Sequence, residues 1–158
     1  MTKENAYLRY ILGFINVLLV ILTISLVFAT IFFALGITDL KLFNNTDMSF
    51  TMSLKEVSPL ANILNLANGY IVVLVLYCVR QFFKNILADK IFVAHNVLLA
   101  KRVALLLVIA SFFGNGIFQF QDYSFFNPTY IITALVVWTL SKVLEKANDI
   151  AAENEFTI

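Results

Sequence analysis

Four stretches of the sequence contain no Asp, Glu, Lys, Arg or His: 11–35, 57–79, 103–121 and 123–141. Each has at least 19 residues, and a helix of about 20 apolar residues crosses the roughly 30 Å of hydrocarbon in a bilayer. A closed barrel, the other architecture that spans a membrane, is built from short alternating strands rather than continuous apolar runs. The sequence therefore predicts an all-α membrane protein with four transmembrane helices.

Composition supports this class and narrows the function. The 158-residue chain is 61% hydrophobic and 13% charged, whereas soluble domains have about 25% charged residues. Ion-coupled carriers place ionisable side chains inside the membrane, and the four runs have none. We find no inverted repeat, so the pattern argues against a secondary transporter. The first run exceeds the roughly 7–15 apolar residues of a signal peptide, which predicts a retained helix.

Basic residues predict the orientation. Only Lys41 and Lys55 fall in the loop after the first run, and the segment around Asp122 has no basic residue. The other nine lie before the first run, between the second and third, or after the fourth: Lys3, Arg9, Arg80, Lys84, Lys90, Lys101, Arg102, Lys142 and Lys146. The positive-inside rule then places both termini of this multi-pass protein in the cytoplasm.

We predict a single domain over residues 1–158, with helices at about 7–35, 57–88, 96–121 and 123–154. Alternating apolar and polar residues at about 38–55 predict a short extracytoplasmic β-hairpin, because a turn-rich Asn-Asn-Thr-Asp stretch interrupts the alternation. In the first helix, Asn16, Thr23 and Thr30 recur every seven residues. Such a polar stripe usually faces neighbouring helices rather than lipid.

Amides gather in what should be the outer half of the membrane. The predicted outer polar cluster contains Asn62, Asn65, Asn68, Asn115 and Gln119. In one interpretation these side chains form interhelical hydrogen bonds worth about 1 kcal/mol or less each. In the other they line a cavity open to the outside. The first interpretation is the more common use of such residues.

The sequence from 140 to 154 predicts a cytoplasmic extension of the last helix. At 100° per residue, its apolar side chains share one face while Glu145, Asp149 and Glu153 lie opposite. The loop between the second and third runs is basic and rich in Phe and Ile. We therefore expect the acidic tail to pack its apolar face against that loop. His95 has no second histidine or cysteine placed to form a metal site, so we predict a capping or surface role.

Two cytoplasmic segments resemble the bacterial domain-of-unknown-function family 2975. ADKIFVAHNVLLAKRVA resembles a Phe-x-x-x-Asn signature with basic residues one to two turns later, and ANDIAAENEFTI resembles the end of that family. Val93 and His95 depart from the hydroxyl and acidic residues common there, which weakens a helix-capping role for this turn. The residues that carry the resemblance are Phe92, Asn96, Arg102, Glu153, Glu155, Thr157 and Ile158. Together with Lys101, they form the cytoplasmic docking layer that we predict.

The resemblance also implies a function, since members of that family have no established enzymatic activity and are often encoded beside a small helix-turn-helix DNA-binding protein. We expect a non-enzymatic regulatory membrane protein that binds or sequesters such a regulator in response to an envelope signal. We predict no catalytic, cofactor-binding or metal-binding residues and no direct nucleic-acid binding. The sequence does not decide whether the chain forms a homo-oligomer. The alternatives are an accessory or immunity-type protein acting on a toxin, lipid or larger complex, and a small channel or carrier.

Overall fold

The structure, a computed structural model, describes residues 3–36, 39–42, 50–53, 58–113, 116–120 and 123–155. Four helices carry most of the chain: α1 (Lys3–Ala34), α2 (Pro59–Leu87), α3 (Ala94–Ala110) and α4 (Pro128–Glu155). Two antiparallel hairpins lie between them, β1 (Asp39–Leu42) with β2 (Phe50–Ser53), and β3 (Phe118–Phe120) with β4 (Tyr123–Phe125). The predicted helical fold and its first hairpin are confirmed.

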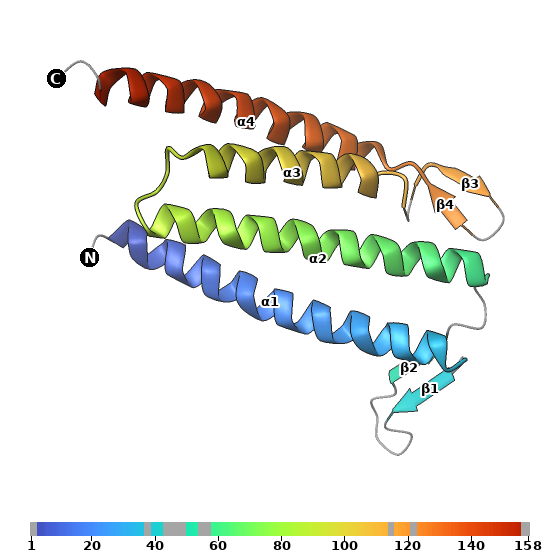
Figure 1. Ribbon diagram of the computed structural model, residues 1–158. Helices are drawn as coiled ribbons and strands as arrows, with labels where there is room; N and C mark the ends of the chain where they lie inside the picture. Colours follow the sequence, from blue (N-terminus) through green and yellow to red (C-terminus); the bar gives the residue numbers. More distant parts are fainter. Residues whose placement is uncertain are drawn as a thin grey trace.

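The helices form an open row rather than a closed bundle. In the described residues, extensive helix contacts join α1 to α2, α2 to α3 and α3 to α4, so α1 and α4 lie at opposite edges (Figure 1). Successive helices run antiparallel. The turn between α2 and α3 therefore lies at the same end of the row as the start of α1 and the end of α4, and both hairpins lie at the other end (Figure 1).

Two helices among the described residues are long and apolar enough to cross a membrane: Ala6–Ala34 and Pro59–Leu87. Helix α3 has 17 residues, a length of about 25 Å against roughly 30 Å of hydrocarbon. Helix α4 has 28 residues, but its second half carries Lys142, Glu145 and Lys146. The structure thus supports two of the four predicted spans.

The predicted helix at 96–121 is wrong beyond Ala110, where a second hairpin replaces it. The backbone amide of Ile117 donates to the carbonyl of Phe126 at 3.1 Å, and that of Asn127 donates to the carbonyl of Ser111 at 2.6 Å. These bonds fold the chain back onto the end of α3. The predicted start of the last helix at 123 is wrong for the same reason, because Tyr123–Phe125 forms the returning strand.

Helix α4 begins at Pro128 and ends at Glu155, one residue beyond the predicted end. Proline is well suited to the first turn because its missing N–H has no intrahelical partner there. The side-chain oxygen of Asn127 accepts a hydrogen bond from the amide of Thr129 at 3.0 Å, which caps the helix. The predicted continuation of the last helix beyond its apolar run is confirmed.

Small buried side chains line the contact between α3 and α4. Ala104 and Ala134 are almost fully buried, and so is Ser141, whose hydroxyl donates to the carbonyl of Trp138 at 2.7 Å. Small residues let two helix backbones approach closely, which strengthens van der Waals packing in a membrane. On the other side of α3, its Leu99 and Val103 pack with Cys78 of α2.

Replacing Ala134 with leucine is expected to lower the free energy of unfolding by about 1–3 kcal/mol, because added carbons must fit a closed contact. Ala134 is 2% exposed. Denaturant unfolding in detergent micelles, followed by circular dichroism, measures the change. Val136→Leu is the control, since Val136 is exposed on the same helix and should tolerate the added methylene. Equal stabilities for the two variants would contradict close packing at Ala134.

Candidate functional site

The end of the row that holds the α2–α3 turn and the last part of α4 carries most of the predicted docking residues, and we call it the charged end. Asn96 lies at its centre and is only 1% exposed. Its side-chain oxygen accepts a hydrogen bond from Asn85 at 2.7 Å. Its side-chain nitrogen donates to the carbonyls of Lys90 and Ile91 at 2.7 and 2.8 Å. Asn96 therefore holds the α2–α3 turn closed and offers little surface to a partner.

The turn itself needs one unusual backbone conformation. Asp89 has a φ of 56°, in the left-handed region that Asp and Asn visit more readily than most residues. At the start of α3, the capping residue Val93 makes no side-chain capping bond, and His95 is exposed in the first helical turn. The Asn96 hydrogen bonds, rather than a helix cap, fix the entry into α3.

An ion-pair network joins α3 to α4 at the charged end. Lys101 contacts Glu145 at 2.8 Å, and Lys142 contacts the other carboxylate oxygen at 2.9 Å. The hydrogen bond from Lys101, followed by that from Lys142, lowers the pKa of Glu145 from 4.5 to about 2. The predicted attraction between the acidic tail and the basic segment is therefore realised here as a contact between α3 and α4.

This network predicts a pH dependence. Because folding lowers the pKa of Glu145, its contribution to stability is complete above pH 4.5 and is lost as pH falls towards about 2. The difference in thermal unfolding midpoint between the wild type and Glu145→Gln should be present at pH 7 and shrink across that window. The side chain is 41% exposed, so the difference should be small. A difference that is constant from pH 7 to pH 2 would contradict this assignment.

The remaining predicted docking residues differ in how far the structure describes them. Phe92 in the turn is 57% exposed, and Arg102 on α3 and Glu153 on α4 are also exposed. Glu155 is the last residue of α4, and Thr157 and Ile158 lie outside the described residues. In contrast to Asn96, Phe92 and Arg102 present accessible side chains at the surface.

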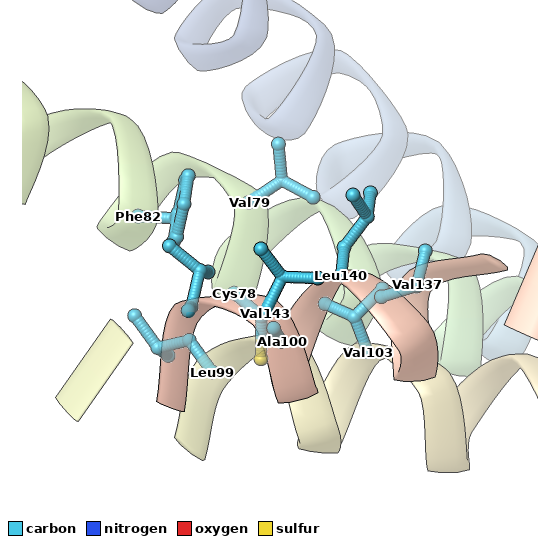
Figure 2. A pocket seen from close by; sticks show the side chains of 10 residues that line it. Cys78, Val79, Phe82, Leu99, Ala100, Val103, Val137, Leu140 and Val143 are labelled. Atoms are coloured by element: carbon cyan, nitrogen blue, oxygen red, sulfur yellow. The ribbon is translucent and has the colours of Figure 1, made fainter. Parts of the chain in front are cut away.

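The apolar face of the α4 extension is not covered as we predicted. Leu140, Val143 and Ile150 remain exposed, because α4 packs along α3 rather than across the α2–α3 turn. An apolar cavity of about 400 Å³ opens beside this face (Figure 2). Three helices line it with Cys78, Val79, Phe82, Leu99, Ala100, Val103, Val137, Leu140, Val143 and Leu144.

A second cavity, of about 340 Å³, lies where the first turns of α3 meet the α4 extension. Its lining combines the apolar side chains of Ala94, Val97 and Leu98 with Lys101, Glu145, Asn148 and Asp149. The side-chain oxygen of Asn148 is buried without a hydrogen-bond partner. Sequence reasoning missed this mixed cavity, since it depends on how α4 is rotated against α3.

The described residues of the predicted outer polar cluster lie on different elements and differ in burial. Asn62 is buried, Asn65 is exposed and Asn68 is half-buried with an unpaired side-chain oxygen. Residues three apart on a helix differ in direction by about 60°, so the three amides of α2 do not all point the same way. Gln119 is exposed on β3 rather than in a helix, and Asn115 lies outside the described residues. The two cavities above are lined by other residues.

Polar contacts between α1 and α2 lie elsewhere. Arg80 donates to the side-chain oxygen of Asn16 at 2.5 Å, and the hydroxyls of Thr30 and Tyr70 are 2.8 Å apart. The expectation that the stripe on the first helix faces a neighbouring helix is confirmed at Asn16 and Thr30. The hydroxyl of Thr23 instead donates to the carbonyl of Leu19 within its own helix, at 2.7 Å.

Comparison with models of known families, with curated proteins and with solved structures finds no match for this chain.

Proposed function

We propose that all four helices lie in the plasma membrane of a bacterium, with both termini and the α2–α3 turn in the cytoplasm. Three observations support this topology. Helices α1 and α2 are long and apolar enough to span. The start of α1, the end of α4 and the α2–α3 turn lie at one end of the row (Figure 1). Nine of the eleven basic residues belong to segments at that end, as the positive-inside rule requires.

Within this topology, the chain is a non-enzymatic regulatory protein whose charged end binds a small helix-turn-helix DNA-binding protein. The observation that carries this proposal is the ordered, exposed surface at that end. The Asn96 hydrogen bonds fix the turn, and the Lys101–Glu145 ion pair ties α3 to α4. This framework holds Phe92 and Arg102 exposed. The choice of partner follows from the resemblance to family 2975.

A photo-crosslinking experiment tests the proposed partner. A photoreactive amino acid replaces Phe92 in the tagged full-length protein, which is expressed in its own host and purified in mild detergent. We expect covalent capture of a small DNA-binding protein. The control is the same substitution at Ile117, an exposed position next to β3 at the opposite end of the row, which should capture no such protein. Equal capture at both positions, or none at Phe92, would remove the proposed partner.

Cysteine labelling tests the topology separately. In a Cys78→Ser background, which removes the single cysteine, one cysteine is introduced in place of Lys90, Glu153 or Ser124. In intact cells, a membrane-impermeant reagent should label the cysteine at position 124 only. Once the cells are opened, it should also label the cysteines at 90 and 153. Labelling of positions 90 and 153 from opposite sides of the membrane would contradict the proposed arrangement.

A further inference from the structure

Helix α3 ends before it could cross the hydrocarbon, and the β3–β4 hairpin follows at that end. The 17 residues of α3 reach about 25 Å of the roughly 30 Å required. The hairpin is held against the helix ends by the Ile117–Phe126 and Asn127–Ser111 backbone bonds. It therefore continues from the outer end of α3 towards the outer boundary of the membrane (Figure 1).

One side of the hairpin and the end of α3 present a cluster of exposed aromatic rings. The rings of Phe118 and Phe125 are paired across the strands with centroids 5.7 Å apart. Phe126 connects them to α3, with its centroid 5.8 Å from that of Phe118 and 6.0 Å from that of Phe112. Phe112 and Phe118 are each 53% exposed and Phe125 is 36% exposed. We call Phe112, Phe118, Phe125 and Phe126 the aromatic patch.

The opposite side of the hairpin is polar. Gln119 and Ser124 are paired in register directly between the other two residue pairs, so their side chains point to the other face of the sheet. A two-stranded hairpin also has two open edges whose backbone N–H and C=O groups need partners. Such edges are not tolerated facing lipid within the hydrocarbon, but water satisfies them at the level of the lipid headgroups.

We propose that the β3–β4 hairpin lies flat in the outer membrane interface, with the aromatic patch buried at the boundary between headgroups and acyl chains. The partner of this surface is the lipid of the outer leaflet. Apolar surface is continuous from the exposed face of α3, which includes Leu105, Val108 and Ile109, to Phe112 and the hairpin. Aromatic side chains are favoured at this depth. The hairpin thereby anchors the outer end of a helix that is too short to reach the interface by itself.

This inference rests on the proposed membrane topology but not on the proposed protein partner. The experiment uses the full-length chain in phosphatidylcholine vesicles. The only tryptophan, Trp138, is replaced by phenylalanine, and a new tryptophan is placed on the aromatic patch (Phe118→Trp) or on the polar face (Ser124→Trp). Fluorescence is quenched either by a nitroxide fixed at the headgroup, the upper acyl chain or the chain end, or by iodide in the water.

We expect the tryptophan at position 118 to lose most of its fluorescence to the headgroup and upper-chain nitroxides and little to iodide. The tryptophan at position 124 should show the reverse preference. Phe125→Trp, on the same face as position 118, repeats the measurement if Phe118→Trp does not fold. Iodide quenching at 118 as strong as at 124, or strongest quenching by the chain-end nitroxide, would overturn the interfacial placement.

The unmodified protein separates the two ways in which the idea could fail. Its Trp138 lies on α4, in the part that the proposed topology places inside the bilayer. Quenching of Trp138 by a lipid nitroxide, combined with iodide quenching at position 118, would overturn only the hairpin inference. If no lipid nitroxide quenches Trp138, the proposed topology fails and the inference fails with it.

Discussion

Replacing Asn96 with alanine is expected to destabilise the protein by about 2–3 kcal/mol, because the substitution removes three hydrogen bonds at a buried position. The amide of Asn85 loses its acceptor, and the carbonyls of Lys90 and Ile91 each lose a donor. The turn between α2 and α3 should then open locally. The measurement is denaturant unfolding in detergent micelles, together with the hydrogen-exchange rates of the turn amides.

His95→Ala is the matched control, since His95 precedes Asn96 in the same helical turn but is exposed. It should change the free energy of unfolding by less than about 0.5 kcal/mol. Asn96→Asp keeps the acceptor for Asn85 but places a carboxylate oxygen against the carbonyl oxygens of Lys90 and Ile91 at a buried position. A loss at least as large as that of Asn96→Ala is therefore expected. If Asn96→Ala is as stable as His95→Ala, the hydrogen bonds of Asn96 do not hold the turn.

Replacing Gly116 with alanine should disrupt the second hairpin. A Cβ at this position would overlap the backbone carbonyl of Phe125, and a backbone cannot move aside as a flexible side chain can. We expect the two strands to separate and the free energy of unfolding to fall by about 1–3 kcal/mol. Hydrogen-exchange protection of the Ile117 amide, which donates to Phe126, reports the separation directly.

Gly13→Ala is the comparison for this substitution. A Cβ at Gly13 would meet nothing within 4 Å, and alanine is the better helix former by about 1 kcal/mol. This variant should therefore be as stable as the wild type or more so. Unchanged exchange protection at Ile117 in Gly116→Ala would show that the hairpin tolerates a side chain at position 116.

The apolar runs predicted the two longest helices and the amphipathic end of the fourth, but they misplaced the boundary after Ala110. A charge-free run indicates a segment whose exposure to water is unfavourable, but it does not distinguish a helix from a strand. A Gly-Asn-Gly stretch at 114–116, followed by Phe-Gln-Phe-Gln at 118–121, is a glycine-rich break before a period-two alternation. Such a pattern is typical of a turn and a strand. A prediction from hydropathy alone does not detect this pattern.

The candidate site was predictable in part. The opposite net charges of the basic loop and the acidic tail indicated an attraction between these segments, and the structure joins α3 to α4 through Lys101 and Glu145. The burial of Asn96 was not predictable, because it depends on the turn carbonyls 5 and 6 residues before it. The apolar face of α4 remained exposed because its rotation is set by small residues such as Ala134, which a hydrophobic pattern counts as weak contributors.

In the proposed topology, the short third helix also bears on how the chain enters the membrane during synthesis. A helix that is shorter than the hydrocarbon is thick, and that packs along α4 through small buried residues, is poorly suited to enter the lipid without its partner. We expect α3 to wait at the lateral gate until α4 has been made, so that the two partition into lipid as one helical pair. Stalling the ribosome before α4 emerges should then leave α3 accessible to protease added on the cytoplasmic side, while α1 and α2 stay protected.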